Sequence, residues 1–140
     1  VCQGGLIMRT YHIDGSQPKA GQVFVFGSNL SGIHGAGAAL AAYRNYGAKW
    51  GAAEGVTGQS YAIPTVREKI AGPCSLEDIH AAVERFLAYT ADHPEVEFFV
   101  TRVGCGLAGH HDGDIAPMFV NAPMNCSLPH TWHQFLRAAA

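Results

Sequence analysis

The sequence predicts an α/β domain with a largely parallel sheet, and three observations support this. Runs of strand-forming residues alternate along the chain with segments of helical character. Two of these strands lead directly into glycine-rich loops, as strands do at the ligand-binding edge of α/β sheets. Finally, 48% of the 140 residues are hydrophobic and 14% are charged, so the chain can bury a core and is not disordered.

The first predicted strand is Val23 to Phe26, an unbroken apolar run that follows a polar arm over residues 11–22. Such a run is typical of a strand buried on both faces. A glycine-rich segment at residues 27–37 comes next, and the alanine-rich run 38–44 predicts a helix that Gly47 ends. The unit is therefore strand, glycine-rich turn, helix.

The middle of the chain predicts a strand, a long helix and another strand. Residues 60–63 form a short strand that Pro64 should stop. Ser75 is placed to cap a helix in which apolar residues recur at helical spacing over 76–90. The following strand is expected over Val96 to Val103.

The C-terminal part is less regular. Asp114 is placed to cap a short helix through Val120. Leu128-Pro129 reads as a break in structure, and residues 131–139 predict a last helix.

We expect a single domain over residues 8–140. Met8 is the expected natural start, with residues 1–7 a leader outside the domain.

Composition excludes several classes of function. The formal charge is −2 and no run of five basic residues occurs, so bulk nucleic-acid binding is not expected, although a single nucleotide is not excluded. No apolar stretch reaches 18 residues and no signal peptide is visible, which favours a cytoplasmic protein without membrane contact. The cysteines Cys2, Cys74, Cys105 and Cys126 form no C-x-x-C pair, so we expect free thiols, no zinc site and no cofactor.

Both glycine-rich loops are suited to an anion. Glycine lets another molecule approach the backbone, and the start of the helix that follows the first loop leaves amide N–H groups free for a phosphate. The second loop, Gly104 to Gly109, has three glycines in six residues and can form a second concavity of the same kind. Two such loops on one edge of the sheet would suit a diphosphate.

Taken in order, these segments resemble those of the macrodomain superfamily of ADP-ribose binders. The matching segments are Val25-Phe26-Gly27-Ser28-Asn29, Gly32-Ile33-His34-Gly35-Ala36-Gly37-Ala38-Ala39, Gly58-Gln59-Ser60-Tyr61-Ala62-Ile63-Pro64-Thr65 and Val103-Gly104-Cys105-Gly106-Leu107-Ala108-Gly109. The Gly-Ala-Gly and Gly-Cys-Gly-Leu segments look most like the branch that contains terminal ADP-ribose glycohydrolases and DNA de-ADP-ribosylating antitoxins. The resemblance covers residues 22–120 and depends on the order of the motifs.

The resemblance implies a three-layer α/β/α fold with a mostly parallel central sheet and a cleft for ADP-ribose or an ADP-ribosylated macromolecule. By position, Asn29 would contact the distal ribose, beside Ser28. Tyr61 and Phe119 would flank adenine or ribose. The residues implied to enclose the diphosphate are Gly35, Ala36 and Gly37 on one side and Gly104, Cys105, Gly106, Leu107, Ala108 and Gly109 on the other.

The sequence departs from that branch at positions that matter for chemistry. The family's Gly-Asp pair, whose Asp holds adenine, has no full counterpart before Val23. The glycohydrolases use a lysine just after the strand that ends near Pro64, and the nearest lysine here is Lys69. They use an aspartate after Gly-Cys-Gly-Leu, where this chain has Ala108. Their covalent chemistry therefore does not carry over.

Three side chains beside the loops are candidates for a catalytic role, namely Asn29, His34 and Asp112. An imidazole at His34 could donate to phosphate or move a proton near neutral pH, and Asp112 could activate water. The simpler interpretations are an exposed loop histidine and a solvated aspartate. His110-His111 with Asp114 has weak metal-ligand spacing, and we predict a solvated loop there instead.

Three functions remain open from the sequence. The chain could hydrolyse an ADP-ribosyl linkage, or bind ADP-ribose without turnover, which the missing lysine and aspartate favour. The third function is a cysteine hydrolase built on Cys105, with His110 or His34 as its base.

Overall fold

The computed structural model describes residues 9–67, 72–106 and 108–137, and its centre is a six-stranded sheet. The strands are ordered β1-β6-β5-β2-β4-β3, and every neighbouring pair is parallel except β3 with β4 at one edge. In sheet order they are β1 (Tyr11–His12), β6 (Cys126–Pro129), β5 (Phe98–Val100), β2 (Val23–Asn29), β4 (Ser60–Val66) and β3 (Gly55–Thr57). The prediction of a mostly parallel α/β sheet is confirmed.

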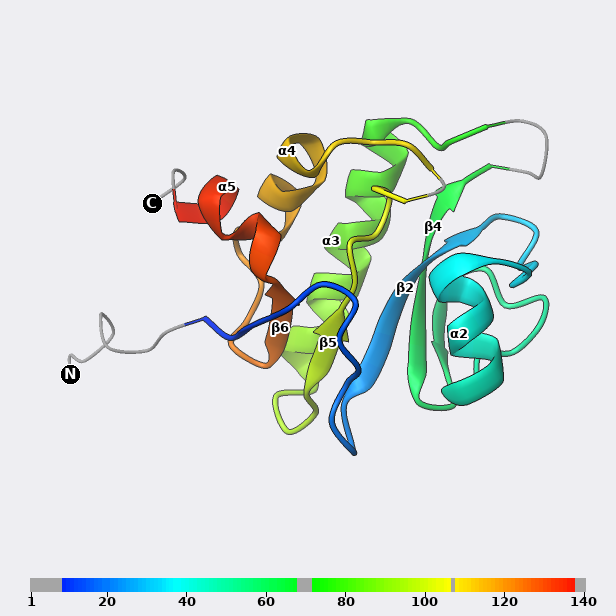
Figure 1. Cartoon of the computed structure of the whole chain (residues 1–140), viewed down its shortest axis with the longest axis horizontal. Coiled ribbons are helices and arrows are strands. Elements are labelled where there is room, and N and C mark those ends of the chain that lie inside the picture. Colours follow the sequence, from blue (N-terminus) through cyan, green and yellow to red (C-terminus); the bar gives the residue numbers. More distant parts are fainter. Residues whose placement is uncertain (1–8, 68–71, 107, 138–140) are drawn as a thin grey trace.

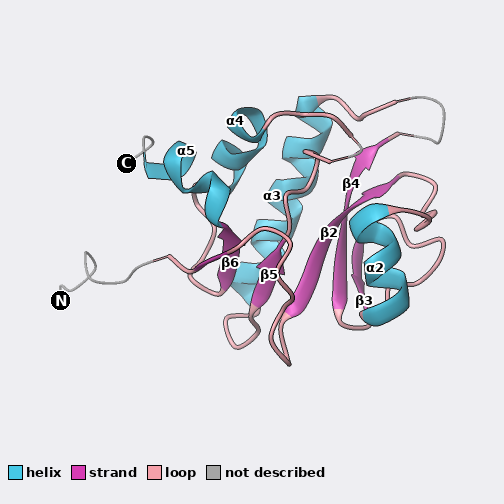
Figure 2. Ribbon diagram, in the orientation of Figure 1, coloured by secondary structure: helices cyan, strands magenta, loops and turns pink. Residues whose placement is uncertain are grey.

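Strand β2 is buried on both faces, as its apolar run predicts. Val23 and Val25 pack into the cluster that contains helix α3 (Leu76–Asp92). Phe24 and Phe26 pack on the opposite face with helix α2 (Gly37–Asn45). Figure 1 and Figure 2 show these two helices on opposite sides of the sheet, which makes three layers.

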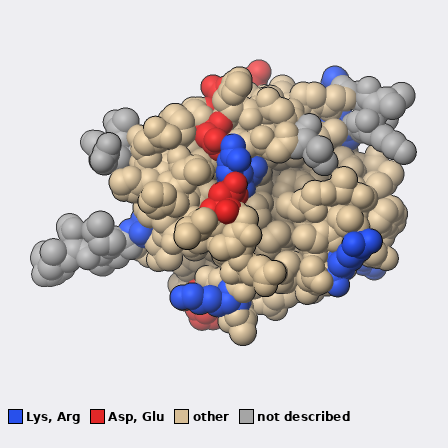
Figure 3. Space-filling model, viewed as in Figure 1, with Lys and Arg blue, Asp and Glu red and all other residues tan. Residues whose placement is uncertain are grey.

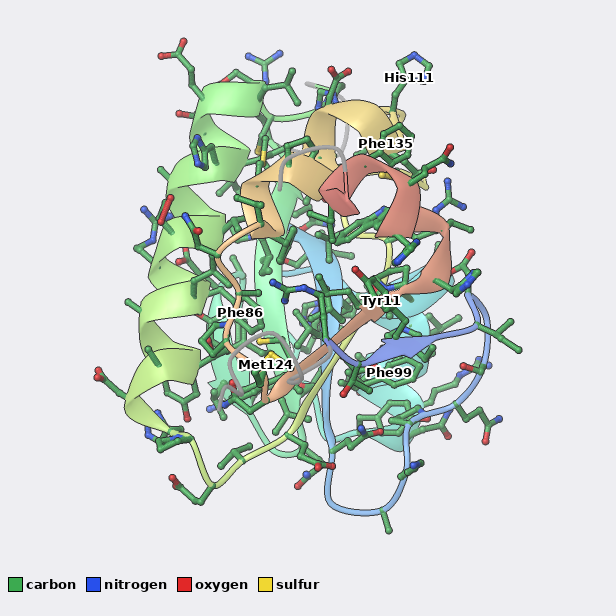
Figure 4. All side chains as sticks on the ribbon, turned by 90° about the vertical axis from the view of Figure 1, so that its left-hand side faces the viewer. Tyr11, Phe86, Phe99, His111, Met124 and Phe135 are labelled. Carbon is green, nitrogen blue, oxygen red and sulfur yellow. The ribbon has the colours of Figure 1, made fainter. Side chains whose placement is uncertain are left out.

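Helix α3 forms where the capping signal predicts. The Ser75 side chain accepts a hydrogen bond from the backbone N–H of Asp78, which satisfies one of the free donors at the helix start. Its apolar stripe includes Phe86, which is fully buried and points toward the sheet, whereas Phe99 lies on the other side (Figure 4).

The C-terminal elements pack on the α3 side. They are α4 (Asp112–Ile115), η1 (Ala116–Phe119), η2 (His130–Trp132) and α5 (His133–Arg137). The expected cap at Asp114 is wrong, because the helix begins two residues earlier and His111 occupies the N-cap position. The expected break at Leu128-Pro129 is also wrong, since both residues lie in the buried strand β6.

Two strand boundaries differ from expectation. Strand β4 continues through Pro64 to Val66. Only residues 60–62 of β4 pair with β3, so the N–H that Pro64 lacks is not needed for a hydrogen bond to β3. Strand β5 is shorter than the apolar run predicts. The backbone N–H of Val96 donates to the carbonyl of His93, and that of Val103 donates to the carbonyl of Thr101. Both ends of the apolar run therefore form local turns instead of pairing with a neighbouring strand.

None of the described helices has the length and hydrophobicity of a membrane span. The three described cysteines, Cys74, Cys105 and Cys126, are free thiols, as predicted. Residues 1–7, and with them Cys2 and the expected leader, lie outside the described residues.

Candidate functional site: a cleft between two glycine loops

A cleft of about 1070 Å³ opens where β2 and β5 end, between the N-terminal arm and α2. Figure 3 shows a hollow on this face of the molecule. Both glycine-rich loops line it, so the two loops that we expect to bind an anion lie at the same cleft. Of the residues predicted to bind ligand, Ser28, Asn29, Gly35, Ala36, Gly37, Gly104, Gly106 and Ala108 line this cleft. Cys105 and Gly109 are not among its lining residues, and Leu107 lies outside the described residues.

The first loop is closed by the side chain of Asn29. Its Nδ2 donates to the carbonyl of Ile33 (2.8 Å), and its Oδ1 accepts from the N–H of the same residue (2.9 Å). The N–H of Gly32 also donates to the Asn29 carbonyl (3.0 Å). The amide of Asn29 therefore shapes the loop, and its remaining N–H and lone pair are what a ligand could use.

The start of α2 presents unpaired amides to the cleft. Ala36 is the N-cap residue, with extended backbone and no capping side chain, and the first turn contains no acidic residue. The first intrahelical bond runs from Leu40 to the Ala36 carbonyl (3.2 Å), so the N–H groups of residues 37–39 have no acceptor within the helix. The positive end of the helix dipole therefore lies at the cleft with no local carboxylate to neutralise it.

The second loop is a tight turn held by its own backbone. The N–H of His110 donates to the carbonyl of Gly104 (2.8 Å), and that of Gly109 donates to Gly106 (3.0 Å). Gly104 has φ +77°, and a Cβ there would lie 3.2 Å from the side chain of Ile115. Glycine is therefore required at this turn for both conformation and space.

Near-parallel rings from four elements form what we call the aromatic floor, consisting of His12, Phe99, Phe24 and Tyr46. His12 stacks on Phe99 with ring centroids 3.8 Å apart, and Phe24 stacks on Tyr46 at 4.5 Å. Phe24 and Phe99 lie 6.2 Å apart with an interplanar angle of 15°. Burial lowers the pKa of His12, which favours its neutral form. Phe24 and Phe99 are only 7% and 3% exposed, so the half-buried rings of His12 and Tyr46 form most of the accessible part of this floor. A planar ligand group could pack against them.

The aromatic floor was not identified from the sequence. The alternation of side chains along a strand places Phe24 and Phe26 on the same face of the sheet. It does not predict which face of the sheet adjoins the cleft. Tyr61 and Phe119, which the resemblance implied as flanks of adenine or ribose, are instead buried in the core. Tyr61 packs against Phe86 and Tyr89, so that implication is wrong.

The carboxylate of Asp112 accepts three hydrogen bonds from neighbouring side chains. Its Oδ1 accepts from Nε of Arg102 (2.9 Å) and Nε1 of Trp132 (2.7 Å), and its Oδ2 accepts from Nη2 of Arg102 (2.7 Å). The hydrogen bond from Arg102 is the main cause that lowers the pKa of Asp112, with Trp132 and Cys105 adding to it. A carboxylate held this way is a weak proton acceptor, and it does not line the cleft.

His34 is fully buried and does not reach the cleft. Its Nε2 bonds to the carbonyl of Lys49 (2.9 Å), and its ring packs edge-on against Phe26 and Trp50. The glycine loop thus folds over this histidine. The expected exposed position is wrong, and the geometry gives His34 a role in supporting the loop.

Cys105 lacks the environment of a nucleophile. Burial, together with the nearby charge of Asp112, raises the pKa of its thiol to about 12. The thiolate is the reactive form, so almost none is present near neutral pH. His110 is occupied with the carbonyl of Cys74 (3.0 Å), and His34 is buried, so neither candidate base serves Cys105.

Among the described residues, no group of three or more His, Cys, Asp or Glu side chains is placed to hold a metal ion. His111 projects outward from the start of α4 (Figure 4). Asp114 lies in the first turn of that helix and is exposed.

The structure is thus an α/β/α protein with a cleft at the carboxyl edge of its sheet. Known structures share this fold. The macrodomain of Mycobacterium tuberculosis DarG aligns with a TM-score of 0.67 at 20% identity, covering 87% of this chain and 97% of that one. The expected macrodomain fold is therefore confirmed.

Two solved structures from Bacteroides thetaiotaomicron have the same architecture. One, a protein of unknown function, aligns with a TM-score of 0.57 at 16% identity, over 88% of this chain and 98% of its own. The other aligns with a TM-score of 0.56 at 15% identity, over 86% and 97%. No protein-family model and no curated protein matches the sequence.

Proposed function

We propose that this protein binds ADP-ribose, free or attached to a macromolecule, in the cleft between its two glycine loops. The observation that carries the proposal is the convergence of both loops on one cleft, which the uncapped start of α2 at the end of the first loop also lines. Backbone amides and a helix dipole bind a diphosphate without basic side chains. The cleft volume of about 1070 Å³ accommodates a ligand of this size.

The aromatic floor lines the part of the cleft next to the loops, and we expect it to bind the adenine base of the ligand. With the diphosphate between the loops, adenine would lie against the aromatic floor, in contact with the half-buried rings of His12 and Tyr46. The distal ribose would then lie near Asn29 and Ile33, where the first loop lines the cleft. The fold shared with the DarG macrodomain is consistent with this ligand class.

Recognition is favoured over turnover by the state of the candidate catalytic groups. Asn29 is bonded to the loop backbone, His34 is buried and Asp112 is paired with Arg102. The carboxylate of Asp112 is therefore a weak base, the imidazole of His34 is out of reach of water in the cleft, and the amide of Asn29 has only part of its hydrogen-bonding capacity left to position water.

Calorimetric titration with ADP-ribose tests the proposal. We expect saturable binding with one site per chain, and no saturation at millimolar ligand would refute the proposal. Release of ADP-ribose from modified protein and from modified nucleic acid should be absent under the same conditions. Turnover lost in Asn29→Ala would establish the hydrolase instead.

A further inference from the structure

Arg102 lies at the junction between the aromatic floor and the second glycine loop. It follows strand β5, three residues beyond Phe99 and two before Gly104, and all three residues line the cleft. A ligand with its base on the floor and its diphosphate between the loops must pass this junction. The part of the ligand at that point is the sugar and the phosphate nearest the base.

The guanidinium of Arg102 is fixed before any ligand arrives. Nε and Nη2 donate side by side to the two oxygens of Asp112, and Trp132, fully buried, donates to the same carboxylate. A forked pairing of this kind sets the plane of the guanidinium as well as its position. Little side-chain entropy then remains to be lost on binding.

Two donors of Arg102 remain available. A guanidinium has five N–H groups, of which Asp112 takes two and the carboxylate of Asp14 takes one from Nη1 at 3.4 Å. The described residues supply no acceptor for the remaining N–H on Nη1 and the remaining N–H on Nη2. One N–H from Nη1 and one from Nη2 can be donated to oxygens of a phosphate.

Arg102 is also the one permanently charged cation among the described residues that line the cleft. Figure 3 shows basic and acidic groups gathered at the edge of the hollow, with other charged groups nearer the rim of this face. Asp14 is the weaker of the two carboxylate partners, because its contact is longer and its side chain is 42% exposed. An incoming phosphate can therefore displace Asp14 without disturbing Asp112.

We propose that Arg102 binds the phosphate nearest the base, and that Asp112 is the positioning residue that holds Arg102 for this contact. The inference rests on the proposed function and adds to it a charged contact that the glycine loops do not provide. It gives the cleft a preference for nucleotides over nucleosides.

Binding of adenosine, AMP and ADP-ribose to Arg102→Gln tests this, with adenosine followed by NMR at millimolar concentration. We expect AMP and ADP-ribose to bind about tenfold more weakly than to the wild-type protein, the size of a lost charge-assisted hydrogen bond, with adenosine changed less than about twofold. The matched control is Arg85→Gln. Arg85 makes the same forked pairing with Glu54 (2.6 and 3.0 Å) but does not line this cleft, and this variant should bind all three ligands as the wild-type protein does.

Unchanged AMP affinity in folded Arg102→Gln would overturn the inference, and so would an equal loss for adenosine and AMP, which indicates a structural role alone. If Arg102→Gln does not fold, Asp14→Asn decides the question. Removing this exposed competing carboxylate should raise the ratio of the adenosine Kd to the AMP Kd, and an unchanged ratio rejects the contact. Wild-type protein that binds none of these ligands would refute the proposed function, whereas wild-type binding that Arg102→Gln retains refutes only the role of Arg102.

Discussion

The side-chain amide of Asn29 pairs with both backbone polar groups of Ile33, four residues further along the chain. These two hydrogen bonds hold the backbone together where β2 ends and the first glycine loop begins. It also fixes the loop that leads to the start of α2, where the unpaired amides lie. The shape of the proposed phosphate site thus depends on a residue that also lines the cleft.

Asn29→Ala should weaken both the fold and ligand binding. Loss of two hydrogen bonds to Ile33 is expected to lower the free energy of unfolding by about 1–3 kcal/mol. Affinity for ADP-ribose should fall at least about tenfold, because the loop amides lose their fixed arrangement. Chemical denaturation and calorimetry measure the two effects. Asn121→Ala, an exposed asparagine outside the cleft, is the control and should change neither. Full affinity in Asn29→Ala would show that the loop holds its shape without this side chain.

The sequence predicted the parts of the fold that depend on local patterns. The Ser75 cap, the apolar stripe of α3 and the doubly buried run of β2 each reflect forces within a few residues, and all three are confirmed. Strand β6 was missed because its four residues are strand only through pairing with β5 and β1, which lie far away in the sequence.

The candidate site also divides into features set by local sequence and features set by contacts between distant residues. The glycine loops were identified because a loop after a buried strand must lie at one edge of a parallel sheet. The partners of Asp112 could not be identified, since Trp132 is 20 residues away and Asp112 reads locally as a solvated loop residue. His34 was misplaced because a histidine among glycines looks exposed until Phe26 and Trp50 are known to enclose it.

Gly35→Val and Gly106→Val should block phosphate approach and leave the fold intact. Both glycines line the cleft, and neither has a backbone in the left-handed region. A Cβ at Gly35 would meet only the side chain of Ile33 at 3.9 Å, and one at Gly106 would meet nothing within 4 Å. The free energy of unfolding should therefore change by less than about 1 kcal/mol, while ADP-ribose affinity falls at least about tenfold. Gly37→Val is a less clean test, because φ at Gly37 is +57° and the variant is strained without ligand.

The alanine variants Gly35→Ala and Gly106→Ala should show smaller losses of affinity than the valine variants, because a methyl group excludes less of the ligand's path. Ala91→Val, on the exposed side of α3, controls for added bulk. Valine variants that are folded and bind ADP-ribose normally would place the diphosphate elsewhere.

The thiol of Cys105 should resist alkylation in the folded protein. With its pKa raised to about 12, only about one thiol in 10⁴ is ionised at pH 8. Iodoacetamide labelling followed by peptide mapping should therefore modify Cys105 far more slowly in the native protein than in guanidinium chloride. Cys105→Ser should retain ADP-ribose binding. Rapid native labelling at pH 8 would mean that the thiol is activated, and would reopen a nucleophilic role for Cys105.

Asp112 should make the stability of the protein fall in acid. Its pKa in the folded state lies below the ordinary value of 3.8, chiefly because Arg102 donates to it, so its contribution is fully present above that value. The contribution is lost as the pH falls from about 3.8 through the lower folded pKa, since the unfolded chain takes up the proton first. Asp112→Asn should accordingly be less stable than the wild-type protein at pH 7, and the gap should narrow below pH 4. Urea denaturation of both proteins from pH 7 to pH 3 measures the gap. A gap that stays constant over this range would mean that the charge of Asp112 contributes nothing beyond its hydrogen bonds.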